Sequence, residues 1–600
     1  MLIVTMKFMC GIIGYIGKRD AQPVLFDCLS KLEYRGYDSC GIAVQNGKLQ
    51  GHKAARRVLE LSESCSFLPG KRGIGHTRWA THGLPTDINA HPHYDCSGKI
   101  AVVHNGIVSN YLALKNQLAD EGHKFLSDTD TEVIPHLIEK YFKGNLLEAV
   151  QSALSDIEGS YAIAVLMEDQ NDLVVSRKDS PLILGLGEGE KYIASDVPAI
   201  LGYTNQVIYL EDGDIASVSE NNVQIFNNQK PVQREVHRIL WDRKETAKNG
   251  FEHFMIKEIR EQPRVISESL VDFPEGYAPE EIFTRKENIR DLLLLACGTS
   301  YNAGLIGKYI IEELLGIPTR VEIGSEFNHR SRLIIPSATI AITQSGETAD
   351  VLIPLKKLRK ANSKTLVITN VPGSSASRIA QSVIYTKAGP EIGVAATKTF
   401  VAQMIELYKI VLSSEMVDPE TARNILAELR ALPAKAQNVL DMADQIEKCA
   451  LYLSSFKALF YVGRGINYPV ALEGALKLKE ISYIHAEGYA AGELKHGPFA
   501  LLDKNTPVLA ILSQDGVYSS MINNIKEIKA RQSPLIVLVD SEKNISGLNP
   551  EKIIKVPQTH PLVSPVVNVI ALQLLAYFTA KLKGCPVDFP RNLAKSVTVE

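Results

Sequence analysis

The amino-acid sequence predicts an α+β layer domain followed by two copies of a doubly wound α/β domain. The chain has 600 residues, and a single hydrophobic core stops growing at about 250–300 residues, so several domains are expected. Short alternating apolar runs occupy the first 241 residues, whereas longer apolar runs followed by Gly, Ser and Thr appear from residue 285 onward. The second pattern occurs twice, which predicts a duplicated domain.

The first domain is expected at residues 10–241. Its apolar runs, such as 99–104, 161–167 and 206–210, are separated by Gly, Asn and Asp. Short runs of this kind are typical of strands, so we expect a strand-rich layer structure with a few helices. The following segment, 242–284, is polar and contains prolines. We expect a linker with some helix there.

The two α/β copies are expected at residues 285–425 and 450–590. Runs at 292–296, 339–343 and 365–369 are apolar along their whole length and are followed by turn residues. Such runs are typical of parallel strands buried on both faces. Segment 293–298 aligns with 459–464, and segment 340–346 aligns with 509–516. A polar tail, 591–600, follows the second copy.

The composition indicates a soluble globular enzyme without nucleic-acid or membrane partners. The formal net charge is -3 and 45% of the residues are apolar, and no apolar run reaches the roughly 18 residues of a membrane-spanning helix. Eight cysteines show neither CxxC nor Cys/His ligand spacing. We therefore expect a reducing cytoplasm and no structural metal. Residues 1–9 are interrupted by Lys7 and make a poor signal peptide.

Two turns in the first α/β copy are candidates for binding a phosphate group. In a doubly wound sheet, anions bind where strand ends lead into helix N-termini. The hydroxyl, amide and small residues at these turns are Thr299, Ser300, Thr343, Gln344, Ser345, Gly346 and Thr348. The second copy has Asp515 at the corresponding turn, and its carboxylate would repel a phosphate. Either turn alone could equally be a helix N-cap, but the pair favours phosphate binding in the first copy.

Acid and base groups are concentrated in the second copy. Glu473, Lys477 and Glu480 have i, i+4 and i+7 spacing and lie on one helix face. Such a face is often only ion-paired. The stretch 483–498, however, adds a group of further acid and base residues, His485, Glu487, Glu493, Lys495 and His496. A carboxylate and an imidazole are the groups that proton transfer between carbon atoms needs.

Lys595 in the polar tail is a candidate for covalent chemistry. Most tails are disordered and their lysines are solvated. A lysine can instead form a Schiff base with a ketone carbonyl when its neighbours keep part of the amine deprotonated.

Cys10 is a candidate nucleophile because it directly follows Met9. Removal of residues 1–9 would leave Cys10 with a free α-amine, whose pKa of about 7.7–8.0 suits a general base for its own thiol. With residues 1–9 attached, the nitrogen is an amide and cannot accept the proton. A lone buried cysteine is usually inert, so the case for Cys10 as a nucleophile depends on the groups that accompany it.

Three segments supply such companions. Asn105 and Gly106 follow a predicted strand and offer amide donors to an oxyanion. Arg78, in segment 76–83, has a guanidinium suited to a substrate carboxylate. Asp130, in segment 128–132, could bind a substrate ammonium, although Asp128 or Thr129 of this segment could simply cap the next helix.

Taken together, these residues resemble the glucosamine-6-phosphate synthase family, the isomerising glutamine:fructose-6-phosphate aminotransferases. The resemblance extends from Cys10 to Glu600. It rests on the segments 10–14, 34–39, 76–83, 345–348, 491–498 and 595–600, whose sequences are CGIIG, YRGYDS, HTRWATHG, SGET, AGELKHGP and KSVTVE.

The resemblance implies an N-terminal-nucleophile glutaminase joined to two sugar isomerase (SIS) domains. In the glutaminase, Cys10 would attack the amide of L-glutamine, and Asn105 and Gly106 would form the oxyanion hole. Arg78 and Asp130 would hold the glutamine, and Trp79 would gate an ammonia tunnel. Thr81 and His82 belong to the same substrate-binding motif.

In the SIS half, the resemblance assigns the phosphate of D-fructose 6-phosphate to the hydroxyl and amide turns. The residues concerned are Ser300, Gln344, Ser345 and Thr348, and the neighbouring Thr299 and Thr343 are further candidates for substrate binding. Lys595 would form the imine, Glu480 would move a proton between C1 and C2, and Lys477 would support Glu480. His496 would open the sugar ring from the neighbouring subunit of a homodimer. No metal or organic cofactor is implied.

Three departures from the family pattern are visible. Family members usually start at Met-Cys, so residues 1–9 indicate a misplaced start codon or a processed leader. Thr343 and Ala396 stand where serine is common, and Ala396 loses one hydroxyl contact to the sugar.

Two other functions fit parts of the pattern. A glutamine amidotransferase acting on a phosphoribosyl donor would lack the duplicated half and would show an acidic phosphoribosyl-binding strand end. A non-catalytic sugar-phosphate sensor would carry a DNA-binding helix-turn-helix with a basic face, and we find none in the sequence.

Overall fold

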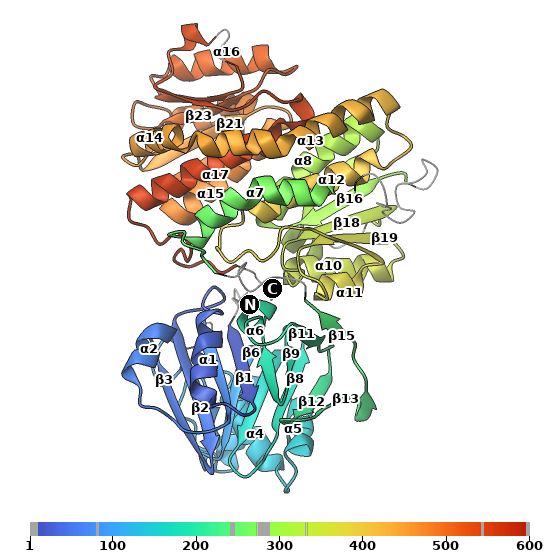
Figure 1. Cartoon of the computed structure of the whole chain (residues 1–600), viewed down its shortest axis with the longest axis vertical. Helices are drawn as coiled ribbons and strands as arrows, with labels where there is room; N and C mark the ends of the chain where they lie inside the picture. The colour runs from blue at the N-terminus through green and yellow to red at the C-terminus, as the bar shows by residue number, and fades with distance from the viewer. Residues whose placement is uncertain are drawn as a thin grey trace. The chain divides into compact units, whose positions relative to one another are not determined.

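The computed structural model describes residues 10–79, 83–239, 247–271, 273, 289–330, 332, 334–541 and 545–595. The chain divides into two compact units. The described residues up to 239 belong to the first unit, with 347–349, and the remaining described residues form the second. Figure 1 shows the elements of both units.

Two antiparallel sheets form the first unit. One contains, in spatial order, β15 (Val236–Arg238), β11 (Gln206–Tyr209), β9 (Ile183–Gly187), β10 (Glu190–Ala194), β1 (Gly11–Ile16), β4 (Arg72–Arg78), β2 (Ser39–Asn46) and β3 (Lys48–Ala54). The other contains β14 (Lys230–Val232), β13 (Val223–Asn227), β12 (Asp214–Val218), β8 (Leu173–Lys178), β7 (Gly159–Met167), β6 (Ile100–Val108) and β5 (His93–Tyr94). The predicted runs at 99–104, 161–167 and 206–210 lie on β6, β7 and β11, which confirms them as strands.

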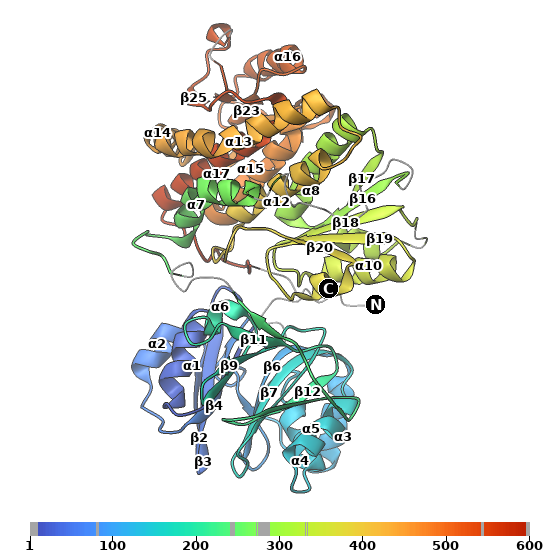
Figure 2. The ribbon, with the colours of Figure 1, turned by 45° about the vertical axis from the view of Figure 1, so that its right-hand side comes forward.

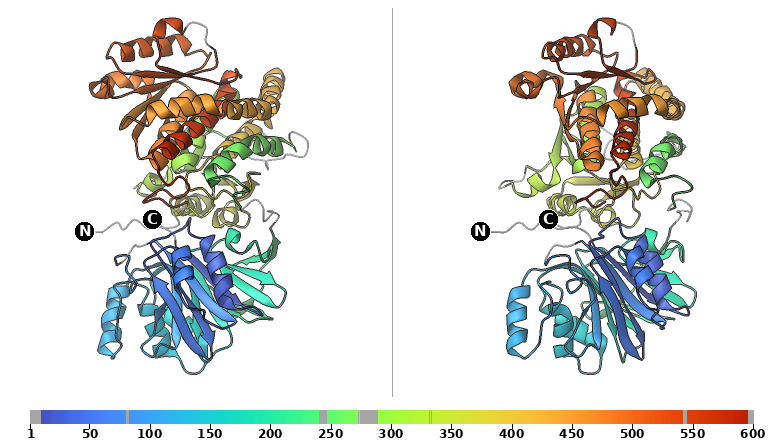
Figure 3. Two further views of the ribbon diagram at one scale, coloured as in Figure 1. Left: turned by 60° about the vertical axis from the view of Figure 1, so that its left-hand side comes forward. Right: turned by 90° about the vertical axis from the view of Figure 1, so that its left-hand side faces the viewer.

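Alternation along β6 explains the layering of this unit. Ala101 and Val103 pack in the cluster that both sheets share, while Ile100 and Val102 pack against helices. Successive side chains of a strand point to opposite faces, so one strand serves two layers. The helices are α1 (Ala21–Ser30), α2 (Val58–Ser64), α3 (Tyr111–Asp120), α4 (Val133–Tyr141), α5 (Leu146–Ser155) and α6 (Val197–Ile200). Figure 3 shows helices outside the paired sheets on both sides.

Two parallel five-stranded sheets form the second unit, and they have the same strand order. The first is β17 (Thr319–Ile323), β16 (Leu292–Ala296), β18 (Ala338–Thr343), β19 (Lys364–Thr369) and β20 (Ser382–Tyr385), seen fanned out in Figure 2. The second is β22 (His485–Ala490), β21 (Ala458–Gly463), β23 (Val508–Leu512), β24 (Leu535–Val539) and β25 (Lys552–Lys555). The duplication that the sequence predicts is therefore confirmed.

Helices join the two sheets into one hydrophobic core. They are α7 (Phe254–Leu270), α8 (Gly298–Leu315), α9 (Gly324–Asn328), α10 (Ala349–Lys360), α11 (Ser375–Ile379), α12 (Lys398–Leu412), α13 (Pro419–Asp441), α14 (Ala443–Leu453), α15 (Asn467–Ser482), α16 (Tyr518–Lys529) and α17 (Ser564–Leu582), with short 3-10 turns η3 (Ala491–His496), η4 (Pro498–Leu501), η5 (Ser546–Leu548) and η6 (Pro561–Val563). One buried cluster includes Leu294 of the first sheet and Tyr461 of the second. In Figure 1, α7, α12, α13, α15 and α17 lie between the two sheets.

Helix α17 has the length and apolar composition of a membrane-spanning helix. The span 561–582 has a mean hydropathy of 1.8, but its most apolar window is 94% buried inside the protein. A helix that is apolar on all sides is also what the centre of a large core requires. We interpret α17 as the central core helix of the second unit.

Helix α7 lies within the segment that the sequence predicts as a linker, and it is part of the core. Met255, Ile259 and Val265 are buried. The first turn of α7 is held by Asp588, whose carboxylate accepts hydrogen bonds from the backbone N–H groups of Phe254 (2.9 Å) and Met255 (3.0 Å). Free N–H groups at a helix start need such partners.

We expect Asp588→Ala to destabilise the second unit. Leaving the buried N–H of Met255 without an acceptor costs about 1–3 kcal/mol, and the partly buried N–H of Phe254 adds to this loss. The midpoint of thermal unfolding should therefore fall. Glu415→Ala, which removes an exposed carboxylate from the same unit, should leave the midpoint unchanged. Equal midpoints for the two variants would contradict this role of Asp588.

Candidate active sites

Cys10 lies at the start of β1, beside the end of the neighbouring strand β4. Cys10 directly precedes β1, and β1 pairs with β4 so that Gly11 faces Thr77. The backbone N–H of Trp79, just after β4, donates to Cys10 Sγ at 3.3 Å. Burial raises the pKa of the Cys10 thiol to about 11, although the Trp79 N–H and nearby arginines oppose the rise. The thiol therefore needs a base to become a nucleophile at neutral pH.

Asn105 is held directly beside Cys10. Its Nδ2 donates to the carbonyl of Cys10 and to Ser195 Oγ, both at 2.9 Å. Its Oδ1 lies 3.0 Å from His76 Nε2, which also lies 3.0 Å from the carbonyl of His104. Both partners of Nε2 are acceptors, so this nitrogen carries the proton. The side chain of Asn105 is thereby fixed from both ends.

His76 is a site residue that sequence reasoning missed as an individual. It is fully buried, and burial lowers its pKa to about 3. A neutral His76 can therefore orient the Asn105 amide without adding charge beside the thiol. The only sequence signal was its membership of segment 76–83.

Gly106 has a backbone conformation that favours glycine. Its φ angle is 137°, and a Cβ atom there would lie 2.1 Å from the carbonyl oxygen of Ser160. A side chain would force β6 away from β7. Gly106 thus keeps its amide beside Asn105, where the sequence predicts an oxyanion hole.

Arg78 and Asp130 lie in the same electrostatic environment as Cys10. Burial lowers the pKa of Arg78, while Cys10, Asp130 and Asp38 act in the opposite direction. Arg78 donates to the carbonyl of Gly83 at 3.1 Å, and Asp130 accepts from the N–H of Val108 at 2.9 Å. Arg78 therefore interacts electrostatically with both the thiol and Asp130, and the substrate contacts of Arg78 and Asp130 stay predictions.

Two further predictions in this segment have different outcomes. Trp79 is buried and its ring packs edge-on against Tyr37, with centroids 5.5 Å apart. Thr81 and His82 lie outside the described residues, so their predicted substrate contacts stay predictions.

In the second unit, the predicted phosphate turns lie at the carboxyl ends of neighbouring strands. Thr299 and Ser300 are in the first turn of α8 after β16, and Thr343 is the last residue of β18, which pairs with β16. Ser300 Oγ accepts from Gln403 Nε2 at 3.0 Å. Parallel neighbours place their carboxyl ends together, as the sequence argument requires.

The turn after β18 is closed by its own hydrogen bonds. The N–H of Gly346 donates to Thr343 Oγ1 at 3.3 Å, and the carbonyl of Gln344 accepts from the N–H of Asn370 at 3.0 Å. Gly346 has a φ of 67°. Ser345 lies in this turn, and Thr348 lies between β18 and α10 along the chain.

The corresponding turn of the second copy is occupied differently. The N–H of Gln514 donates to the carboxylate of Asp540, at 3.0 Å. The backbone donor that could face an anion is therefore already bound to an acid of the chain itself. This arrangement agrees with the expectation that only the first copy binds phosphate.

Lys477 links the two copies. Its Nζ lies 2.6 Å from Glu480 Oε2 and 3.5 Å from Glu473 Oε1, and it donates to Thr299 Oγ1 at 3.0 Å. Burial alone would lower the pKa of Lys477, but the two carboxylates outweigh burial and raise it.

The two acids beside Lys477 differ in exposure. Glu473 is completely buried and accepts from Asn302 Nδ2 at 2.8 Å, whereas the side chain of Glu480 is 20% exposed. Only Glu480 can therefore combine an ion pair with access to a substrate.

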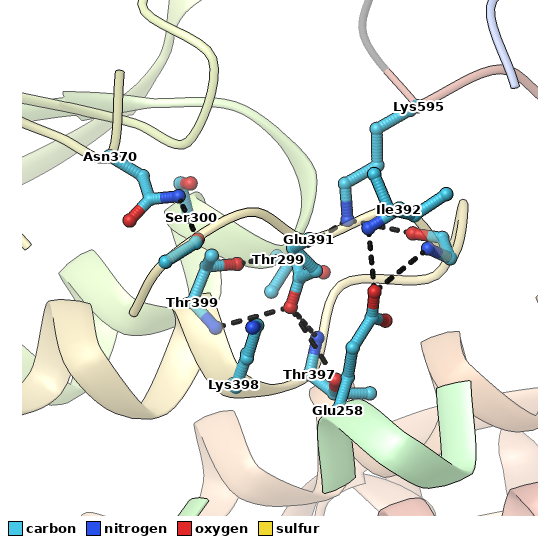
Figure 4. A network of polar contacts seen from close by, with 12 residues as sticks. Glu258, Thr299, Ser300, Asn370, Glu391, Ile392, Thr397, Lys398, Thr399 and Lys595 are labelled. Atoms are coloured by element: carbon cyan, nitrogen blue, oxygen red, sulfur yellow. Dashed lines mark hydrogen bonds and ion pairs between the residues drawn. The ribbon is translucent and has the colours of Figure 1, made fainter. Parts of the chain in front are cut away.

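Lys595 belongs to a buried network that the sequence did not reveal (Figure 4). Its Nζ lies 2.5 Å from Glu391 Oε2 and 2.7 Å from the carbonyl of Gly393. Glu391 also accepts from the N–H of Thr397 at 2.8 Å and from the hydroxyl of Thr399 at 2.7 Å. These partners, Lys595 above all, lower the pKa of Glu391 to about 2, although burial opposes them.

Glu258 supports the same loop from α7. It accepts from the N–H groups of Ile392 (2.6 Å) and Gly393 (3.1 Å). Burial and the neighbouring charge of Glu391 raise the pKa of Glu258 to about 7. In the sequence, Glu391 is noticeable only as the single acid of the apolar, glycine-containing stretch 389–396. No sequence feature indicated Glu258.

His496 is exposed at the end of η3. Among the described residues, no contact connects it with Glu480 or Lys595. The sequence-based role of His496 therefore stays a prediction.

Comparison with known families agrees with both half-sites. The SIS domain family matches residues 287–413 and 452–580. The glutamine amidotransferase domain family matches residues 76–202. The second match includes Arg78, Asn105 and Asp130, and the first includes Thr299 and Lys477.

Curated relatives match over almost the whole chain. The glutamine–fructose-6-phosphate aminotransferase (isomerizing) of Methanosarcina acetivorans is 47% identical and covers 99% of this chain and 100% of its own length. The enzyme of the same name from Thermococcus kodakarensis is 48% identical with the same coverage.

Among solved structures, the C-terminal domain of glucosamine-fructose-6-phosphate aminotransferase from Francisella tularensis covers 57% of this chain and 100% of its own, with 38% identity and a TM-score of 0.54. Full-length identity of this degree goes together with the duplicated SIS fold and with a partly buried cysteine beside amide donors. The chain therefore belongs to the family of isomerising glutamine–fructose-6-phosphate aminotransferases.

Proposed function

We propose that the chain converts D-fructose 6-phosphate and L-glutamine into D-glucosamine 6-phosphate and L-glutamate, an early step of amino-sugar synthesis. The observation that carries this proposal is the pairing of two specialised half-sites in one chain. One surrounds Cys10 with amide donors, and the other holds a buried lysine, Lys595, beside an acid. The relatives named for this reaction match both halves.

At the first half-site, the α-amine of Cys10 would take the thiol proton, and the thiolate would attack the side-chain amide carbon of glutamine. Asn105 and Gly106 would stabilise the oxyanion. Collapse of the intermediate would release ammonia, which takes up the proton from the amine. Water would then hydrolyse the thioester and yield glutamate. Arg78 and Asp130 would bind the carboxylate and ammonium of the substrate.

At the second half-site, the turns at 299–300 and 344–348 would hold the sugar phosphate. Lys595 would leave Glu391 and condense with the C2 carbonyl, with loss of water. Ammonia would displace the lysine from this imine. Glu480, supported by Lys477, would then move a proton from C1 to C2, which completes the amino sugar.

Three further properties belong to this proposal. Ammonia released to water would become protonated and unreactive, so we propose that it travels from Cys10 to the sugar inside the protein.

His496 would open the sugar ring from a second subunit of a homodimer, which fits its exposure in one chain. We also propose that the protein works in the cytoplasm, where reducing conditions would suit its eight free cysteines.

A non-catalytic sugar-phosphate sensor is the second function that the SIS domains allow. The distinction rests on Lys595, because a sensor needs no imine. In an enzyme, Lys595→Ala should abolish glucosamine 6-phosphate formation and leave glutamine hydrolysis measurable. Lys583→Ala, an exposed lysine of the same C-terminal region, serves as control. Normal product formation by Lys595→Ala would exclude this mechanism.

The free α-amine can be tested by changing the first residue. A chain that begins at Cys10 should hydrolyse glutamine. A chain that retains residues 1–9 should not, because its nitrogen is an amide and the buried thiol has a pKa of about 11. Intact mass would establish the first residue in each preparation, and glutamate release would be the assay. Equal glutamate release by both chains would refute the role of the amine.

Glu391 is expected to position Lys595. Glu391→Gln removes the buried partner of the lysine, and misplacement of a reacting group by about 1 Å can cost about 100-fold in rate. Glucosamine 6-phosphate formation should fall by that order, and borohydride trapping of the sugar on Lys595 should fall in parallel. Glutamine hydrolysis should be unchanged. Glu391→Asp should recover part of the trapping, which a general folding defect would not allow.

A further inference from the structure

A cluster of four potential metal ligands lies in the first unit, apart from Cys10. Cys96 follows β5, His123 follows α3, and His136 and Glu139 lie on α4 with i, i+3 spacing. One ligand atom from each side chain lies within 4.8 Å of all the others. Three separate segments of the chain therefore contribute to one point.

Three of four distances between the ligand atoms agree with the edges of a tetrahedron around zinc, and the fourth is slightly shorter. Cys96 Sγ lies 3.5 Å from Nδ1 of His123 and 3.5 Å from Nδ1 of His136. Glu139 Oε2 lies 3.1 Å and 3.6 Å from the same two nitrogens. Zinc bonds of about 2.0–2.3 Å to N, O and S in a tetrahedral site imply edges of about 3.3–3.6 Å.

Hydrogen bonds account for only part of this cluster. The contact of His123 with Glu139 has hydrogen-bond length, and the 3.5 Å contact of His136 Nδ1 with Cys96 Sγ is ordinary for sulfur. The 3.6 Å contact of His136 Nδ1 with Glu139 Oε2, however, is long for a hydrogen bond. His136 is 1% exposed, so the partners of its Nδ1 must come from inside the protein. A cation at the centre would satisfy Nδ1 of both histidines at once.

Backbone donors support the charged forms of the two acidic ligands. The N–H of Lys124 donates to Cys96 Sγ at 3.5 Å, and the N–H of Cys96 donates to Glu139 Oε2 at 3.2 Å. Such donors stabilise a thiolate and a carboxylate and fix their direction, as the outer shell of a metal site does.

We propose that Cys96, His123, His136 and Glu139 form a closed zinc site. A thiolate, a carboxylate and two neutral imidazoles would balance the charge of Zn²⁺. Mixed S, N and O donors in tetrahedral arrangement are typical of zinc, whereas Mg²⁺ and Ca²⁺ prefer oxygen. Four protein ligands leave no open position, so the ion would be structural.

The site would fasten the segment that carries Asp130. His123 and His136 flank this segment in the sequence, and Phe125 packs on the ring of His136 with centroids 4.5 Å apart. Glu132, also between them, accepts from the N–H groups of Leu126 and Ser127. Zinc would hold the chain before Asp130 against α4 after it. The inference of the site itself does not depend on the proposed reaction.

From the sequence we expected no structural metal. The four ligands are 27, 13 and 3 positions apart, and only the i, i+3 pair on α4 has a short ligand spacing. Only the turn of the chain after α3 brings the first two to α4.

The test is stoichiometric binding of zinc to the full chain under reducing conditions. The purified protein, stripped with a chelator, should take up one Zn²⁺ per chain. With Co²⁺ it should show a thiolate-to-cobalt absorption band in the near ultraviolet. Cys96→Ser should abolish this band and weaken zinc binding beyond the about 10- to 100-fold that loss of an outer-shell partner costs. Cys65→Ser, a partly exposed cysteine of the same unit, should change neither.

Thermal unfolding gives an independent readout. An ion that binds only the folded state stabilises it, so zinc should raise the unfolding midpoint of the parent chain and of Cys65→Ser, but not of Cys96→Ser. Failure of the parent chain to bind zinc, or an unchanged cobalt band in Cys96→Ser, would overturn the proposal. Glutamine hydrolysis is not needed for either measurement, so the outcome is separate from that of the proposed function.

Discussion

The buried ammonium of Lys477 is the interaction on which the architecture of the second unit depends. A charge without water is tolerated only if partners surround it, and two carboxylates and a threonine hydroxyl do so here. Thr299 comes from the first α/β copy and the acids from the second. Polar contacts inside an apolar core thus join the two duplicated domains and help to fix their relative position where the sugar site is predicted.

The duplication explains how one fold serves two tasks. Both copies keep the same strand order, so each offers a turn after its third sequential strand. In the first copy this turn ends in hydroxyl and amide groups, while in the second Asp540 binds the backbone donor. The predicted anion site in the first copy would leave α15 of the second copy free to carry acid and base groups. This difference between the copies rests on a few side chains of a shared fold.

Sequence patterns predicted the fold well because strands and repeats are local features. The runs at 292–296 and 339–343 are strands of the predicted kind, since burial on both faces demands unbroken apolar residues. Partners that meet only through tertiary structure were not predictable. Glu258 on α7 binds the loop that carries Glu391, although the two segments are more than 100 positions apart. Sequence periodicity cannot reveal a contact of this kind. His76 was hidden for the same reason.

The amide of Asn105 has one more consequence. Both of its N–H bonds are already used, by the carbonyl of Cys10 and the hydroxyl of Ser195. An incoming ligand oxygen must compete with these acceptors, and an uncharged carbonyl is no better an acceptor than the one already in place. A developing negative charge is a much stronger competitor. If Asn105 serves as the proposed oxyanion donor, its occupied N–H groups would favour the activated species over the bound substrate.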